Sequence, residues 1–409
     1  MSKTFGIAAL VAGALILTGA CIESEDPKLG KVREEYLAMS EAGSGSFADQ
    51  VSASALKHLQ QVAKENREGN WMISPFSLQE CLGMVRLGAV GETNSELAEW
   101  LGADTDPGAT SVLAGGFRKQ LSPLMQAGVF STANGLWVEA GDSFLPDYLA
   151  VVKKDYDGGA KTFSSTSQAL EEVNSFVKEG TMGMIPKLLE ELDPSTAAVL
   201  VNAVSFKDKW EVPFDKAKTV IKDFQTPEGA RKVPMMAGKK GFFAKEVDGF
   251  ILGSGSFKTG LKITFALPPS PRDPPESCFP ALLEAAKEGI TEPARAFEIP
   301  RLKSGFKWNL KKTMMDMGVV RAFGPGADFS KMMGGGVFIS EALQKTFVEF
   351  DEEGVKAAAA TAVTMTKSAP PRGDVAFVAD RPFAYVIHDA KGMPFFAGVV
   401  RDPRSPGED

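Results

Sequence analysis

The chain has 409 residues, of which 44% are hydrophobic and 28 are phenylalanine. This is enough apolar material for one large buried core, although the length alone also allows two or three average domains. The formal net charge is −7 and the pI is about 5.3. A chain without a basic surplus has little to displace the counterions of a phosphate backbone, so nucleic acid is excluded as a partner.

Histidine and cysteine are rare in this chain. A Ser–His–Asp hydrolase would have to use His58, whose polar, helix-like surroundings favour a solvated surface position, or His388, at the end of a predicted strand. No pair of Cys or His has metal-ligand spacing, so we expect no metal, no other cofactor and no enzyme activity. The sequence does not decide whether Cys81 and Cys278 pair.

The N-terminus has the order of a signal peptide. Lys3 precedes the apolar run Ile7–Leu17, which is too short to span a membrane. The following Thr-Gly-Ala-Cys21 resembles a bacterial lipobox, although threonine stands where a branched aliphatic residue is usual. We predict a signal peptide over 1–20 and a lipidated Cys21 that anchors the protein to a membrane, at the cell surface or in the periplasm. A secretory signal with an incidental cysteine is the alternative.

The composition changes twice after the signal peptide. Residues up to 45 are polar, charged and finally Gly/Ser-rich, which predicts a flexible tether over 21–45. A globular pattern then continues with no repeat and no low-complexity break. We place one domain over 46–403 and a C-terminal tail over 404–409.

Hydrophobic periodicity predicts the elements of this domain. Helical spacing occurs over 47–65, 77–87 and 92–101, the second being mostly apolar. Strand-like runs follow at 135–138, 198–206, 261–267, 336–339, 375–380, 384–388 and 395–400. Helices dominate the first half and strands the end, so we expect a mixed α/β fold with several sheets.

Several stretches in order resemble the serpin family and cover nearly the whole domain. They are Asn70-Trp-Met-Ile-Ser74-Pro-Phe-Ser77, Leu87–Thr93, Asn134-Gly-Leu-Trp137, Val173–Ile185, Val201-Asn202 to Trp210 and Phe214, Ile299-Pro-Arg-Leu, Leu310 with Met317, Ala327-Asp-Phe-Ser330, Phe377–Phe383 and Phe395–Gly398. The resemblance implies eight or nine helices around three β-sheets, with an exposed reactive-centre loop. It also implies a monomer that forms a covalent complex with a target serine protease.

The resemblance implies that the segment after residue 351 is the reactive-centre loop, which the target protease attacks. Its four alanines favour a helix, but the β-branched residues around them favour a strand. As a strand, the face that begins at Val355 is mostly apolar and the face that begins at Lys356 is small, polar or charged. The resemblance implies that hinge and insertion involve Glu352, Glu353, Gly354, Val355, Lys356, Ala357, Ala358, Ala359, Ala360 and Thr361.

Two positions depart from the usual serpin pattern. Val355 stands at the first inserting position, where Thr or Ser is usual, and Gln344 stands where many serpins have a buried histidine. A glutamine both donates and accepts hydrogen bonds, so we expect it to keep the buried cluster. The residues that the resemblance assigns to sheet opening are Ser74, Ser77, Asn202, Trp210 and Gln344.

The scissile bond can be placed in two ways. Matching the local Ser-Ala-Pro-Pro pattern puts it at Lys367–Ser368, whereas counting from the hinge puts it at Ser368–Ala369. We favour Lys367, which suits the acidic specificity pocket of a trypsin-like enzyme. Arg372 is a third option, and Met365 applies if the target prefers apolar residues.

Three functions remain open at this point. The first is suicide inhibition of a trypsin-like serine endopeptidase by loop insertion. The second is a non-inhibitory serpin that binds a partner, although its expected signature of hinge prolines, charges or bulky residues is missing from the alanine run. The third is cross-class inhibition of a cysteine protease, which uses the same loop.

Overall fold

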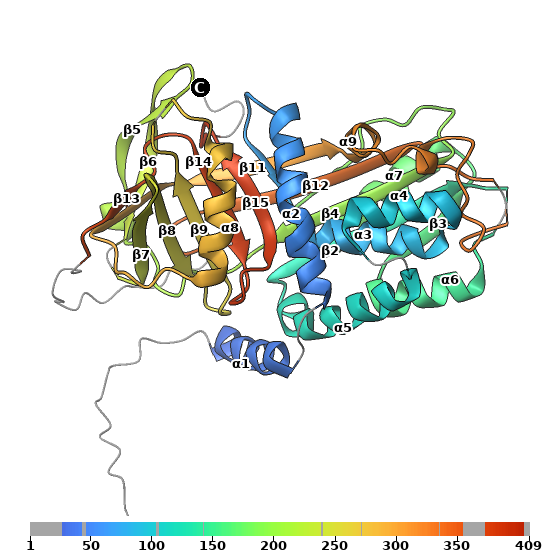
Figure 1. Ribbon diagram of the computed structural model, residues 1–409, viewed down its shortest axis with the longest axis horizontal. Helices are drawn as coiled ribbons and strands as arrows, with labels where there is room; N and C mark the ends of the chain where they lie inside the picture. Colours follow the sequence, from blue (N-terminus) through green and yellow to red (C-terminus); the bar gives the residue numbers. More distant parts are fainter. Residues whose placement is uncertain are drawn as a thin grey trace, which may run out of the picture.

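The computed structural model describes residues 27–42, 46–103, 106–141, 143–238, 240–270, 272–334, 336–354 and 373–404. Within these ranges the chain forms nine α-helices and three β-sheets (Figure 1). The mixed α/β fold predicted from the sequence is therefore confirmed.

A five-stranded sheet, the central sheet, runs along the molecule. Its order is β11 (Leu302–Asn309), β12 (Glu341–Phe350), β4 (Ala198–Phe206), β2 (Phe130–Glu139) and β3 (Gly159–Phe163). Every residue of β4 is buried, because its continuous apolar run suits a strand that is covered on both faces. Figure 1 shows β4 and β12 side by side over the length of this sheet.

Two further sheets complete the β structure. The six-stranded sheet has the order β1 (Trp71–Ile73), β15 (Pro394–Val400), β14 (Phe383–His388), β9 (Lys262–Leu267), β8 (Phe250–Ser256) and β7 (Phe242–Val247). The four-stranded sheet has the order β13 (Ala376–Val378), β10 (Ala296–Pro300), β6 (Gly229–Gly238) and β5 (Val220–Thr226). β12 and β13 therefore lie in different sheets, although they are neighbours in the sequence.

Helices pack on both faces of the central sheet and on the six-stranded sheet. They are α1 (Pro27–Ala42), α2 (Ser46–Glu65), α3 (Pro75–Gly88), α4 (Gly91–Leu101), α5 (Pro107–Gln126), α6 (Pro146–Val151), α7 (Thr166–Gly180), α8 (Phe279–Glu288) and α9 (Leu310–Asp316). α3 contacts β2, β4 and β15, whereas α7 packs on β2, β3 and β4 through a separate apolar cluster. Ser74 caps α3 by accepting from the Ser77 N–H, and Pro75 fits the first helical position.

The tether predicted over 21–45 is wrong for its described part, because residues 27–42 form α1. Tyr36 of this helix is only 3% exposed, and α1 contacts α5 (Figure 1). Arg33 forms an ion pair with Glu211 at 2.9 Å. The polar composition of the segment suggested a solvated chain, but buried Tyr36 and the partly buried Leu29, Val32 and Leu37 pack it on the domain.

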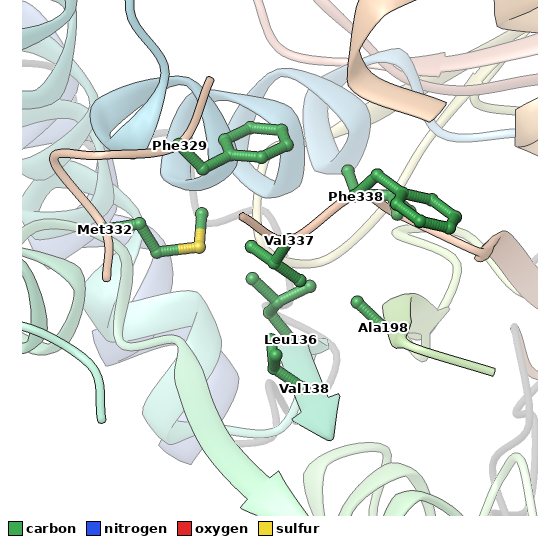
Figure 2. A pocket seen from close by; sticks show the side chains of 8 residues that line it. Leu136, Val138, Ala198, Phe329, Met332, Val337 and Phe338 are labelled. Atoms are coloured by element: carbon green, nitrogen blue, oxygen red, sulfur yellow. The ribbon is translucent and has the colours of Figure 1, made fainter. Parts of the chain in front are cut away.

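The strand predicted over 336–339 is also wrong. These residues form a loop that leads into β12, and Val337, Phe338 and Ile339 use their apolar side chains to pack on the sheet. Figure 2 shows Val337 beside Leu136 and Val138, close to Ala198. The pocket between them leaves no room for water, so this loop closes the start of β4 with apolar contacts.

The histidines and cysteines of the domain are buried. His58 is fully buried rather than solvated as predicted, because its ring stacks on Trp100 at 3.9 Å and its Nε2 lies 3.1 Å from the Trp100 carbonyl oxygen. His388 ends β14, as expected. Cys81 and Cys278 are free thiols without solvent exposure.

Candidate functional site

The middle of the central sheet is a parallel pair of strands. The register of β4 and β12 runs from Val199 opposite Glu341 to Ser205 opposite Phe347, and we call this pairing the seam. The outer neighbours β2 and β11 pair antiparallel with β4 and β12. The seam is therefore the parallel pairing among these four strands, and parallel pairing is in general slightly less stable per residue than antiparallel pairing.

A buried hydrogen bond joins the two sides of the seam. Gln344 on β12 lies in register with Asn202 on β4, and its Nε2 donates to Asn202 Oδ1 at 2.5 Å. Gln344 Oε1 accepts from the Ser74 backbone N–H at 3.1 Å. Gln344 therefore donates and accepts, as a glutamine can at this position.

The cluster continues from Asn202 into α3. Asn202 Nδ2 donates to Ser77 Oγ at 2.6 Å and to Asn134 Oδ1 at 2.6 Å. Ser74 Oγ donates to the Phe395 carbonyl at 2.7 Å and so ties the cap of α3 to β15. The structure thus brings together Ser74, Ser77, Asn202 and Gln344, all fully buried. Their role in sheet opening stays a prediction.

Residues 351–354, the hinge turn, follow β12 at the end of the seam. Trp210, the fifth residue of the predicted set, lies here and not in the polar cluster. Its backbone N–H donates to the Glu353 carbonyl at 2.9 Å, and its indole N–H donates to the Asp351 carbonyl at 2.8 Å. The ring stacks on Phe257 with centroids 4.8 Å apart. A buried tryptophan therefore holds the backbone of the hinge turn.

The two glutamates of the hinge turn are anchored by cations. Arg301 Nη2 donates to Glu352 Oε1 at 2.7 Å, and Thr219 Oγ1 donates to the same oxygen at 2.5 Å. Burial alone would raise the pKa of Glu352, but these hydrogen bonds hold it below its ordinary value. Glu353 forms an ion pair with Lys216 at 2.5 Å. The contacts of Glu352 and Glu353 must therefore break if the hinge turn changes its conformation.

Gly354 lies at a position that only glycine fits. Its φ is +155°, and a Cβ there would lie 2.2 Å from the Asp208 carbonyl oxygen and 2.5 Å from Lys209 Cα. A side chain would therefore collide with backbone atoms in addition to straining φ. Gly354 also forms an isolated antiparallel bridge with Lys209.

Several predicted site residues lie outside the described residues. They are Cys21, Val355, Lys356, Ala357, Ala358, Ala359, Ala360, Thr361, Lys367, Ser368 and Ala369. The described chain stops at Gly354 beside the seam and resumes at Gly373, close to β13 of the four-stranded sheet.

Sequence reasoning missed Asn134, Arg301 and Asp208 as members of this site. Asn134 could have been suspected, because it is a polar residue in a strand that is buried over almost its whole length. Arg301 and Asp208 gave no such signal, since their contacts join segments far apart in the chain. No group of His, Cys, Asp or Glu within the described ranges could hold a metal ion. None of the helices described is long and apolar enough to cross a membrane.

Comparison with known proteins identifies this arrangement. The family described as Serpin (serine protease inhibitor) matches residues 49–403. Serine protease inhibitor 42Dd of Drosophila melanogaster is 31% identical over 360 residues, which cover 84% of this chain and 94% of that protein. Alpha-1-antiproteinase of Ovis aries is 28% identical and covers 96% of this chain and 98% of its own.

Solved structures agree with the sequence comparisons. The crystal structure of Serpin48 from the insect Tenebrio molitor matches with a TM-score of 0.78 and 27% identity, covering 88% of this chain and 98% of that one. Uncleaved ovalbumin matches with a TM-score of 0.75 and 26% identity, covering 88% of this chain and 100% of its own. The chain therefore belongs to the serpin family, a family of protease inhibitors and not of enzymes.

Proposed function

We propose that this serpin is a suicide-substrate inhibitor of a trypsin-like serine endopeptidase, and that it traps the acyl-enzyme by inserting the loop from Val355 onward into the seam. The observation that carries the proposal is the position of Gly354. It ends the hinge turn beside two parallel, directly paired strands of the central sheet.

The strand directions supply a driving force for insertion. A chain that reverses at Gly354 runs antiparallel to β12, and because β4 is parallel to β12 it also runs antiparallel to β4. Insertion would replace one parallel pairing by two antiparallel pairings and add a full strand of backbone hydrogen bonds. Residues 355–366 would span roughly 40 Å as a strand, a long path for an attached protease.

The residue that enters the specificity pocket of the protease is inferred from the sequence. We place the scissile bond at Lys367–Ser368, with Ser368–Ala369 as the alternative, because a lysine fits the acidic pocket of a trypsin-like enzyme. The protease serine would attack the scissile carbonyl carbon, expel the new amino terminus and remain joined to the inhibitor as an acyl ester. Insertion before water cleaves that ester would trap the enzyme.

A covalent complex with trypsin is the test. The chain from residue 22 onward, incubated with trypsin, should give a band on a denaturing gel with the combined mass of inhibitor and protease. Mass spectrometry of the released C-terminal peptide should show Ser368 as its first residue. Cleavage without a complex and without a gain in thermal stability contradicts inhibition and favours a non-inhibitory serpin. A complex with papain but not with trypsin would favour the cross-class alternative.

Two matched variants make this test specific for insertion. Ala359→Arg puts a charge on the loop face expected to be buried, whereas Ala358→Arg puts the same charge on the opposite face. The first variant should be cleaved as a substrate with little complex, and the second should still form complex. Equal behaviour of the two variants contradicts the proposed strand insertion.

We also propose that the protein is a bacterial lipoprotein held outside the cytoplasm through Cys21. The basic, apolar and small-residue order before Cys21 supports this assignment. Cells that express the full chain should incorporate labelled palmitate into it, and Cys21→Ser should abolish the label. Label that persists in the Cys21→Ser protein contradicts the assignment.

A further inference from the structure

Three amide side chains form a row across the central sheet. Asn134 on β2, Asn202 on β4 and Gln344 on β12 occupy in-register positions on adjacent strands. Gln344 Nε2 donates to Asn202 Oδ1 at 2.5 Å, and Asn202 Nδ2 donates to Asn134 Oδ1 at 2.6 Å. We call these residues the amide row. It crosses the seam between its second and third members.

The amide row ends at a buried ion pair. Asn134 Nδ2 donates to Glu80 Oε2 at 3.4 Å, and Arg118 Nη1 donates to the two Glu80 oxygens at 2.8 and 2.9 Å. The Glu80 side chain is 0% exposed and that of Arg118 is 12% exposed. Burial raises the pKa of Glu80 and the Arg118 guanidinium opposes the rise. All of these contacts come from donors, which fits a carboxylate that only accepts.

Each amide of the row is oriented by a group that can only donate or only accept: Glu80 orients Asn134, the Ser77 carbonyl orients Asn202, and the Ser74 backbone N–H orients Gln344. The carboxylate of Glu80 requires the NH₂ group of Asn134 on its side, so the Asn134 oxygen faces Asn202. Asn202 presents its own NH₂ group to this oxygen and to the Ser77 carbonyl at 3.0 Å, so its oxygen faces the seam. That oxygen is the acceptor that Gln344 needs.

We propose that Glu80, held by Arg118, is a positioning residue that fixes the orientation of Asn134, preserves its hydrogen bond with Asn202 and so helps to keep the seam closed until the loop inserts. This inference rests on the proposed function, because a closed seam matters for a protein that opens it. A neutral amide at position 80 removes the constraint, since it also offers an NH₂ group. A reversed Asn134 would then place two NH₂ groups face to face at Asn202.

Uptake of a loop peptide measures this effect directly. The probe is the acetylated peptide of residues 355–366 with a fluorophore at its C-terminus, added to the purified protein, and the readout is the rate of its stable incorporation. Glu80→Gln should take up the peptide roughly threefold to tenfold faster than wild type, the range expected from losing one buried hydrogen bond, that between Asn134 and Asn202 beside the seam. Glu80→Asp keeps the charge but withdraws it from Asn134, and it should also accelerate uptake.

Two controls separate orientation from general loosening. Asn134→Ala removes the side chain that links Glu80 to Asn202. Adding Glu80→Gln to this variant should therefore change the uptake rate less than about twofold. Asp155→Asn alters another buried carboxylate, which accepts from Ser111 on α5 at 2.8 Å, and should leave uptake near the wild-type rate.

The outcomes distinguish this inference from the proposed function. If the wild-type protein takes up no peptide, insertion itself fails and both proposals fall. If wild type takes up peptide and Glu80→Gln and Glu80→Asp match it, the inference alone is overturned. An equal acceleration by Glu80→Gln in the Asn134→Ala background, or by Asp155→Asn, also overturns it, because the effect would then bypass the row.

Discussion

Asp208, which lies against the hinge turn, should make the stability of the protein depend on pH. Its carboxylate accepts from Thr259 Oγ1 and from the Lys209 N–H, and its carbonyl oxygen lies against Gly354. Burial raises the pKa of Asp208 to about 7, although these hydrogen bonds oppose the rise. The folded protein therefore binds a proton here over a pH range in which the unfolded chain has released it.

The sign of the resulting pH dependence can be tested by substitution. Between about pH 4 and about pH 7 the folded state holds more protons at Asp208, so this residue lowers the unfolding temperature as pH rises. Asp208→Asn stays neutral and should lack this fall, so its unfolding temperature relative to wild type should be higher at pH 8 than at pH 5. Scanning calorimetry at both pH values measures the difference. Asp328→Asn is the control, because hydrogen bonds from Ser330 lower the pKa of Asp328, and an equal gain there would contradict the assignment.

At the scale of single residues, the sequence predicted which side chains meet but not how they are oriented. Gln344 was expected beside Ser74, Ser77 and Asn202 because the resemblance to serpins assigns those positions. The chain of contacts from Asn202 through Asn134 to Glu80 was not predicted, because its members come from three separate elements. Donor and acceptor directions follow from the three-dimensional arrangement, which periodicity does not contain.

At the scale of elements, predictions succeeded where burial alone determines structure. The continuous apolar run of β4 and the mostly apolar α3 were found because packing on both faces leaves a clear pattern. α1 was missed because its apolar residues do not follow a clear helical spacing and because its position depends on contacts with distant parts of the chain. An isolated helix of that length is marginal in water, so docking must stabilise it.

Tyr36 should contribute most to the docking of α1, because Leu29, Val32 and Leu37 are only partly buried. It is buried beside Asp389, whereas the Arg33–Glu211 ion pair is close to half exposed and therefore weak. Tyr36→Ala should cost about 3–5 kcal/mol, enough to release the helix. Hydrogen exchange should then become fast over 27–42, while Arg33→Ala should leave it slow. Slow exchange over 27–42 in Tyr36→Ala would show that other contacts hold α1.

At the scale of the whole molecule, the order of strands in the sheets matters more than their number. Motif order predicted the family and hence three sheets, and the structure confirms them. Neither composition nor periodicity states that β4 and β12 are parallel neighbours, since they lie more than a hundred residues apart. If the loop inserts as proposed, this arrangement leaves a more stable strand pairing unused, and a kinetic barrier would then maintain the native state.

The free cysteines give an experimental means of following that barrier. Cys81 and Cys278 have no exposed surface, and burial raises the pKa of both thiols, that of Cys278 to about 12. A protonated thiol that solvent cannot reach does not react with maleimides. A chain that starts at residue 22 lacks Cys21 and therefore has no reactive thiol within the part of the protein described. One cysteine introduced after residue 354 would then be the single attachment point for a dye. A change in its fluorescence on reaction with a protease would report in real time the insertion proposed above.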